Sequence, residues 1–203
     1  MDELACNKTQ FDFEHGATSC MAASMCCARL FLEKDLRRED ILRVLNAGAT
    51  LYGRWASADG ENNGLQCWTD VVNTYPRFLQ RAKVVYEGNG FFGATHRDEN
   101  ASTILFDDML DACATPTARH RVAGVLTTNG ASYMIGKDAN YWYAFDPHGT
   151  SSTESTGATM RRSHDRATMA DYVRNEVACG TASTQFSVVL FSMVDDAEPT
   201  ALI

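Results

Sequence analysis

Proline is scarce in this sequence, and long apolar runs are missing from it. Only 4 of the 203 residues are proline, and no run approaches the roughly 20 apolar residues that a membrane-spanning helix needs. With 45% apolar and 22% charged residues, the chain lacks the composition of a disordered or linker-rich protein. The acidic start, MDELACNKTQ, also lacks the basic and apolar regions of a secretory signal. We therefore predict one folded domain over residues 1–203, with no membrane partner and no signal peptide.

Basic residues are outnumbered by acidic ones, 18 against 26, which gives a formal net charge of −8. The adjacent basic pairs are Arg37-Arg38 and Arg161-Arg162, and neither has the aromatic neighbours on which bases stack. A chain of this charge repels a phosphate backbone. The balance therefore argues against nucleic acid as a partner and is compatible with a basic protein or peptide.

The seven cysteines include no C-x-x-C pair. An odd number without paired spacing indicates neither a disulfide framework nor a zinc site, so we expect reduced thiols. His15, His96, His120 and His164 lack the i, i+4 spacing of a helical metal pair and are interpreted as loop or surface residues. We expect no metal and no cofactor.

Hydrophobic periodicity separates a helical part of the chain from a strand-rich part. Helical patterns, caps and stop signals predict helices at 19–35, 36–48, 68–82, 101–114 and 163–180. Strand patterns and turn residues predict strands at 83–87, 121–128, 132–138, 141–148 and 184–194. The predicted fold class is α+β, with a helical N-terminal half packed on a mostly antiparallel C-terminal sheet.

The segment Asp146-Pro147-His148 places a carboxylate and an imidazole two positions apart at the end of an aromatic strand. In extended backbone, residues i and i+2 share a face, so the two side chains project together. The carboxylate can then accept from one ring nitrogen and leave the other free to act as a base. The alternative interpretation is a simple turn over DPHG, because Asp-Pro and a following glycine are turn formers.

A base of this kind needs a nucleophile, and Cys20 is the best candidate. It lies where a loop containing Gly16 becomes a predicted helix, and a helix N-terminus lowers the pKa of a thiol. Cys26 and Cys27 fall inside the same helix and are interpreted as core. The alternative for Cys20 is likewise a packed thiol at a helix start.

Acyl transfer to a thiolate also requires donors for the developing oxyanion. The backbone amide of Cys20 is one candidate, and the side-chain amide of Gln10, ten residues upstream, is another. His15 is close enough to Cys20 in sequence to be a rival base. The candidate catalytic set is therefore Cys20, His148, Asp146 and Gln10.

The order of Gln10, then Gly16-Ala17-Thr18-Ser19-Cys20, then Tyr143-Ala144-Phe145-Asp146-Pro147-His148-Gly149 resembles a papain-like cysteine peptidase. More narrowly, it resembles the deubiquitinase domain of the herpesvirus large tegument protein and the related enzymes of some intracellular bacteria. The resemblance covers most of the chain in the order of its elements, and its specific parts are the Cys and Asp-x-His blocks. Ser19 departs from that family, which often has glutamine or a similar polar residue before the cysteine.

The resemblance implies hydrolysis after the C-terminal glycine of ubiquitin, with a papain-like domain spanning residues 1–203. Cys20 would be the nucleophile, His148 the general base, Asp146 its orienting residue and Gln10 an oxyanion donor. The implied partner is ubiquitin or polyubiquitin, and the implied place of action is the cytoplasm of a host cell, with the protein carried in a virion tegument or secreted as a bacterial effector. The alternatives are a non-catalytic ubiquitin-binding or interaction module, and a cysteine peptidase for another ubiquitin-like modifier.

Two further stretches have competing interpretations. The run GNGFFG at 88–93 matches G-x-G-x-x-G, but no helical periodicity follows it, so we interpret it as a glycine-rich turn and not as a dinucleotide site. The Ser-, Thr- and Gly-rich segment 149–162 is flexible by composition and overhangs the proposed cleft; we interpret it as a solvated connection, the alternative being a loop that helps to hold ubiquitin.

Overall fold

The computed structural model describes residues 1–58, 64–93, 103–114, 121–149, 157–177 and 183–193. In these ranges one sheet of eight strands has the order β1-β7-β6-β5-β4-β8-β2-β3, antiparallel throughout except for the β2–β3 pair. The strands are β1 (Asp2–Ala5), β2 (Ala82–Phe91), β3 (Thr103–Leu105), β4 (Val122–Thr128), β5 (Ala131–Lys137), β6 (Trp142–Asp146), β7 (Thr159–Ser163) and β8 (Gln185–Met193). The predicted mostly antiparallel sheet is confirmed.

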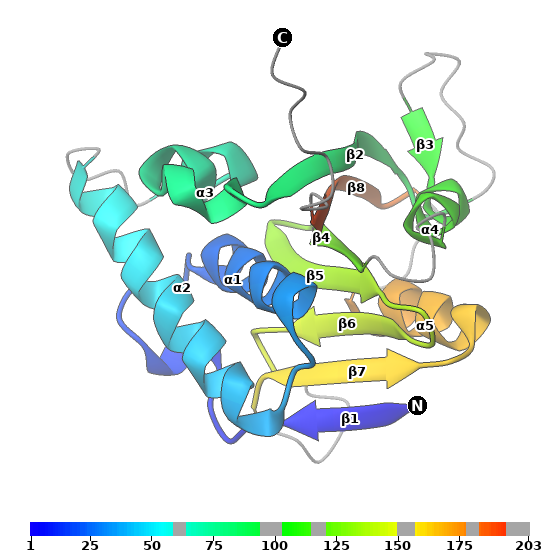
Figure 1. The fold of residues 1–203 in the computed structure, drawn as a ribbon, viewed down its shortest axis with the longest axis horizontal. Helices are drawn as coiled ribbons and strands as arrows, with labels where there is room; N and C mark the ends of the chain where they lie inside the picture. The colour runs from blue at the N-terminus through cyan, green and yellow to red at the C-terminus, as the bar shows by residue number, and fades with distance from the viewer. Residues whose placement is uncertain (59–63, 94–102, 115–120, 150–156, 178–182, 194–203) are drawn as a thin grey trace, which may run out of the picture.

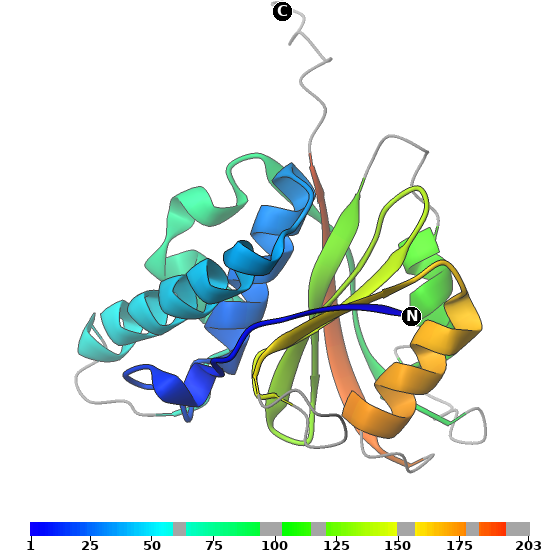
Figure 2. The same ribbon diagram turned by 90° about the horizontal axis from the view of Figure 1, so that it is seen from below.

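Helices cover both faces of this sheet (Figures 1 and 2). The helices are α1 (Cys20–Glu33), α2 (Arg38–Ala58), α3 (Trp68–Thr74), α4 (Phe106–Ala114) and α5 (Arg166–Tyr172), with 3-10 turns at Gln10–Asp12 and Pro76–Leu79 and a π-helical turn at Val173–Val177. The helices α1, α2 and α3 bury one apolar cluster with the sheet, and α4 and α5 bury a second cluster on the opposite face. None of the helices in these described ranges is long and apolar enough to cross a bilayer.

The meander from β4 to β6 follows the sequence pattern closely. Asn129 and Gly130 form the β4–β5 turn with positive φ angles of 51° and 75°, as a tight hairpin turn requires. β5 then pairs with β6, and β6 with β7, so the strand that ends at Asp146 lies inside the sheet. This central position fixes the backbone that carries the candidate base.

The predicted end of the second helix at Gly48 is wrong, because α2 continues to Ala58. A Cβ atom on Gly48 would lie 2.6 Å from the backbone of Ala23 in α1. Glycine at this position therefore permits the close crossing of the two helices and does not terminate α2. Residues 59–63, which follow α2, lie outside the described ranges.

Two strands at the β1 end of the sheet were not predicted. The edge strand β1 falls in the polar lead-in, and β7, next to it, overlaps the segment 149–162 that the sequence suggests is a loop. They pair with each other and are tied by ion pairs from Arg161 to Glu3 and from Arg162 to Asp2. Charged cross-strand pairs replace the apolar alternation by which strands are recognised.

Other predicted boundaries also move. The helix expected at 68–82 stops at Thr74, because Pro76 disfavours helical backbone in the residue before it. The glycine-rich turn at 88–93 is wrong as well, since β2 extends through Phe91 and pairs with β8 along its length. The predicted helix at 101–114 begins only at Phe106, after β3.

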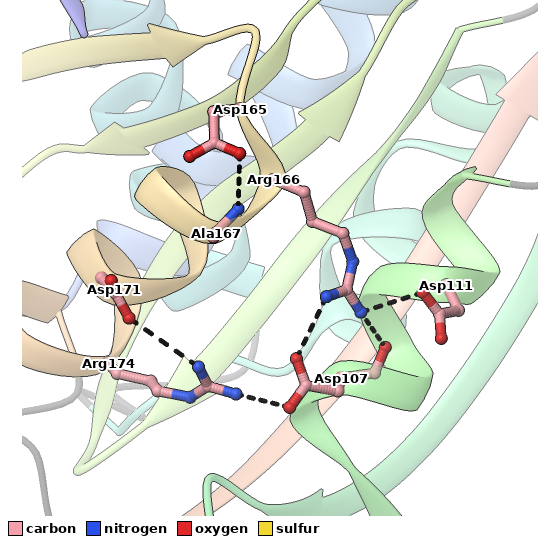
Figure 3. A network of polar contacts seen from close by, with 7 residues as sticks. All are labelled: Asp107, Asp111, Asp165, Arg166, Ala167, Asp171 and Arg174. Carbon is pink, nitrogen blue, oxygen red and sulfur yellow. Dashed lines mark hydrogen bonds and ion pairs between the residues drawn. The ribbon is translucent and has the colours of Figure 1, made fainter.

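The two helices on the far face of the sheet are joined by a charged network (Figure 3). Arg166 and Arg174, from α5 and the turn that follows it, both contact the carboxylate of Asp107 in α4, and Arg166 also contacts Asp111. Asp165 caps α5 by accepting from the backbone of Ala167 and the residue after it. These contacts fix where α5 lies over β6 and β7.

Candidate active site

Cys20 is the first residue of α1, and its side chain is buried. The loop before it folds back on the Gln10–Asp12 turn so closely that a Cβ atom on Gly16 would lie 2.2 Å from the Gln10 carbonyl oxygen. Only glycine fits this approach. The loop thus brings the start of α1 next to the lead-in segment. Cys20 lies at a helix N-terminus, as predicted.

Asp146 and His148 form a carboxylate–imidazole pair. The Nδ1 atom of His148 lies 2.8 Å from Oδ1 of Asp146, and the backbone N–H of His148 donates to the same oxygen at 2.8 Å. Gly149 has a φ of 77°, so the chain turns directly after the histidine. The two interpretations of DPHG therefore coexist, because the segment is a turn and also pairs the two side chains.

The imidazole of His148 also acts on Cys20. Burial raises the pKa of the Cys20 thiol, but the His148 ring and the Ser132 groups lower it by more, so that the pKa lies below its ordinary value. Burial lowers the pKa of His148, while Asp146 and Cys20 raise it to about 9. A thiol of lowered pKa beside a histidine of raised pKa favours a thiolate–imidazolium pair.

Other cysteines lack this environment. Burial raises the pKa of Cys113 to about 12 and that of Cys27 well above its usual range. Cys67 is exposed at the start of α3, where its thiol contacts Asp70 and Thr69. Within the described residues, Cys20 is therefore the thiol placed for nucleophilic chemistry.

Gln10 is buried and opens the 3-10 turn, which Thr9 and Asp12 cap reciprocally. Its backbone N–H donates to the carbonyl of Pro147 at 2.9 Å, next to His148. The side-chain Oε1 of Gln10 has no hydrogen-bond partner among the described residues. The structure thus brings all four predicted site residues, Gln10, Cys20, Asp146 and His148, into one region.

Ser132 is a site residue that the sequence did not reveal. It lies in β5, and its backbone and hydroxyl groups both lower the pKa of Cys20. Its hydroxyl also contacts the Thr127 hydroxyl at 3.0 Å, and its carbonyl accepts from Ser24 of α1 at 3.0 Å. A serine after a hairpin turn carries no sequence signal of this role, because only the packing of α1 on β5 creates it.

Two aromatic rings flank the His148 imidazole. The ring centroid of Phe11 lies 6.0 Å from it and that of Tyr133 lies 5.1 Å from it. Phe11 is 58% exposed although it is a large apolar residue. Phe11 is therefore an exposed aromatic side chain next to the imidazole.

The remaining histidines have other surroundings. His15 packs against Tyr52 of α2, with ring centroids 5.5 Å apart, and His164 contacts the Asn140 carbonyl. His96 and His120 lie outside the described residues. In the ranges that the structure describes, no group of three or more His, Cys, Asp or Glu side chains could hold a metal ion.

Comparison with known proteins gives a structural match and no sequence match. Neither a protein-family profile nor a curated protein matches this sequence. The fold is similar to the crystal structure of a ubiquitin-specific protease encoded by a murine cytomegalovirus tegument protein, in complex with a ubiquitin-based suicide substrate. The TM-score is 0.73 at 15% sequence identity, over 98% of this chain and 89% of that chain. The chain therefore has a papain-like α+β fold, shared with a distant viral deubiquitinase.

Proposed function

We propose that this chain is a cysteine-type deubiquitinase that hydrolyses the peptide or isopeptide bond after the C-terminal glycine of ubiquitin. The observation that carries the proposal is the arrangement of Cys20 at a helix start beside His148, with Asp146 bonded to the other side of the imidazole. The fold of a protease bound to a ubiquitin-based substrate supports the choice of substrate.

The first half of the reaction forms a thioester. The Cys20 thiolate attacks the carbonyl carbon of the ubiquitin glycine, and the carbonyl electrons move onto its oxygen. As the tetrahedral intermediate collapses, the C–N bond breaks and the His148 imidazolium gives its proton to the leaving amine. Ubiquitin remains attached to Cys20 as a thioester.

The second half restores the enzyme. Neutral His148 takes a proton from a water molecule, whose oxygen attacks the thioester carbonyl. The C–S bond breaks, the Cys20 thiolate departs, and ubiquitin leaves with a free carboxylate. Asp146 keeps the imidazole oriented in both halves, since it holds Nδ1 and leaves Nε2 for proton transfer.

The negative charge on the carbonyl oxygen requires donors in each half. We assign them to the backbone N–H of Cys20, at the N-terminus of α1, and to the side-chain amide of Gln10. The unpaired backbone amides of the first helical turn also favour the thiolate.

A reduced environment suits the proposal, because an oxidised Cys20 could not attack. We propose that the protein acts in the cytoplasm of a host cell, on ubiquitin or polyubiquitin conjugates. The cysteines of the described residues are free thiols, in keeping with this.

The test is covalent capture by ubiquitin carrying a C-terminal alkyne, read by intact mass. Wild type should gain the mass of one ubiquitin, and Cys20→Ala should gain none. Cys67→Ala is the matched control, because Cys67 is the exposed thiol, and it should be captured like wild type. Capture that persists in Cys20→Ala would overturn the assigned nucleophile.

A second arm uses alkyne probes made from ubiquitin-like modifiers. Capture by one of these and not by ubiquitin would identify a peptidase for that modifier. No capture by any probe, together with measurable ubiquitin binding, would make the chain a binding module and refute the proposed hydrolysis.

A further inference from the structure

The Asp146 carboxylate uses only one of its two oxygens on His148. Oδ1 accepts both contacts from His148, whereas Oδ2 is buried and has no hydrogen-bond partner among the described residues. A carboxylate oxygen without a partner in the protein interior is costly. The burial of Oδ2 without a hydrogen-bond donor therefore needs an explanation.

Two other buried polar atoms without a hydrogen-bond partner in the described residues are the hydroxyls of Thr159 and Tyr172. Thr159 is the register partner of Asp146 across the β6–β7 pair, so both side chains project from the same face of the sheet. Thr159 is fully buried and Tyr172 is 5% exposed. Both hydroxyls are hydrogen-bond donors, and Oδ2 is an acceptor.

Tyr172 lies close to both of the other residues. Burial raises the pKa of Tyr172 to about 12. The Arg161 charge and a hydrogen-bonding interaction with the Thr159 side chain oppose this rise, and the Asp146 and Glu3 charges add to it. The guanidinium of Arg161 lies 4.4 Å from the centre of the Tyr172 ring. The Asp146 carboxylate and the Thr159 and Tyr172 hydroxyls thus belong to one buried cluster between α5 and the β6–β7 pair.

The position of Tyr172 is set by the remainder of α5. The Arg166 and Arg174 contacts with Asp107 hold this helix against α4 (Figure 3), and Met169, one turn before Tyr172, is buried in the core of this face. Contacts at both ends of α5 therefore hold Tyr172 on the side of Asp146 that faces away from His148.

We propose that Thr159 and Tyr172 are positioning residues of the active site, which donate their hydroxyl hydrogens to Oδ2 of Asp146 and thereby hold Oδ1 toward His148. The hydroxyl hydrogens turn freely about their C–O bonds, so each hydroxyl can donate to Oδ2 once side-chain rotation brings the two oxygens within hydrogen-bond distance. The pair acts through Asp146 and does not touch the substrate. This role rests on the proposed function and extends the site to the face of the sheet opposite α1.

The test uses Thr159→Val and Tyr172→Phe, which remove the hydroxyls and keep the shapes of the side chains. Each should lower kcat/KM for a ubiquitin–fluorophore substrate by about tenfold, the usual scale for one hydrogen bond to a charged group. Thr159→Ser, which restores a hydroxyl, should recover most of the loss. Tyr141→Phe, at the opposite end of β6, is the matched control and should behave like wild type.

A double-mutant cycle separates positioning from general damage. In an Asp146→Ala background, Thr159→Val should cost no further activity, because the oxygen that Thr159 serves is gone. Additive losses, or wild-type kcat/KM in both Thr159→Val and Tyr172→Phe, would overturn the proposal. Melting temperatures identify any variant that fails to fold, and the other hydroxyl-deleting variant then decides the question.

A readout that needs no ubiquitin keeps this inference separate from the proposed function. The readout is the rate at which iodoacetamide alkylates Cys20, measured across pH by peptide mass mapping. This rate reports on the ionisation of the Cys20–His148 pair. The His148 imidazole also faces Asp146 of β6 and Tyr133 of β5. Without the hydroxyl donors, Oδ1 of Asp146 is no longer held toward the imidazolium, so the high-pH transition should move downward. An unchanged profile in both variants would refute the positioning role, whatever the ubiquitin probe shows.

Discussion

The backbone N–H of Gln10 donates a 2.9 Å hydrogen bond to the carbonyl of Pro147, which joins the start of the chain to the segment between Asp146 and His148. Two more backbone bonds reinforce this junction, from Cys6 to the Ala158 carbonyl at 3.1 Å and from Ala158 to the Lys8 carbonyl at 2.7 Å. The lead-in segment is therefore a structural part of the site. It carries Gln10 and the exposed Phe11 to the imidazole.

Gln10→Ala should lower kcat by about 10²–10³-fold, the usual effect of losing one oxyanion donor, and should change KM little. The backbone bond to Pro147 remains in this variant, so the site should stay assembled. Steady-state kinetics on ubiquitin–fluorophore check the split between kcat and KM. Wild-type kcat in Gln10→Ala would move the oxyanion role to another residue.

The activity of the wild type should follow a bell-shaped pH profile. Attack needs the Cys20 thiolate, whose pKa is lowered, and departure of the amine needs the His148 imidazolium, whose pKa is raised to about 9. As the pH increases, activity should therefore rise with a midpoint below the pKa of an ordinary thiol. It should fall again as the pH passes about 9. The profile of kcat/KM against pH measures both limbs.

Asp146→Asn should move the alkaline limb to lower pH, because the carboxylate is a main cause of the raised His148 pKa. The same variant should also lose activity through misorientation of the ring. An alkaline limb that stays in place in Asp146→Asn would show that another group controls the histidine.

Ser132→Ala should raise the pKa of Cys20, because the serine hydroxyl stabilises the thiolate. The acid limb of the alkylation profile should then shift upward, and kcat/KM at neutral pH should fall by about three- to tenfold, as for one lost hydrogen bond. Ser57→Ala, whose side chain is exposed on α2, serves as the control. Identical profiles for the two variants would remove Ser132 from the site.

Gly48→Ala should destabilise the fold. Alanine improves helix propensity by about 1 kcal/mol, but its Cβ would meet the Ala23 backbone at 2.6 Å, and overpacking of this kind costs about 1–3 kcal/mol. The clash is with rigid backbone and should win, so the melting temperature should fall by several degrees.

Gly53→Ala is the matched control for that substitution, since it lies in the same helix and its Cβ would meet only the His15 ring, at 3.3 Å. The half-exposed ring can move aside, so this variant should lose less stability than Gly48→Ala. Thermal unfolding that lowers both equally would show that the α1–α2 crossing is not the cause.

Local patterns were sufficient to predict part of this protein. The start of α1 at Cys20, the hairpin at Asn129-Gly130 and the strand that ends at Asp146 all follow from residues close together in the chain. The Asp146–His148 pair could be predicted for the same reason, because a spacing of two residues is a local geometry. The roles assigned to these residues stay predictions until the variants are measured.

Tertiary structure decided the rest, where the partners are distant in sequence. Gly48 has the local signature of a helix stop, yet its contact with Ala23 keeps it inside α2. β1 and β7 have no apolar alternation; they form strands through backbone pairing with each other and of β7 with β6, and charged cross-strand pairs add to this. Ser132 beside Cys20 likewise depends on how α1 and β5 pack, which no short segment of sequence encodes.

The site itself shows the same division. Its candidate nucleophile and base come from two local motifs. Their meeting depends on the packing of α1 on the sheet and on the backbone hydrogen bond from Gln10 to Pro147. The cluster of Asp146, Thr159 and Tyr172 depends on strand register and on the position of α5. The sequence by itself determined which groups are chemically able to react, whereas the fold decided which of them lie together, because long-range packing and register set distances that local propensity does not.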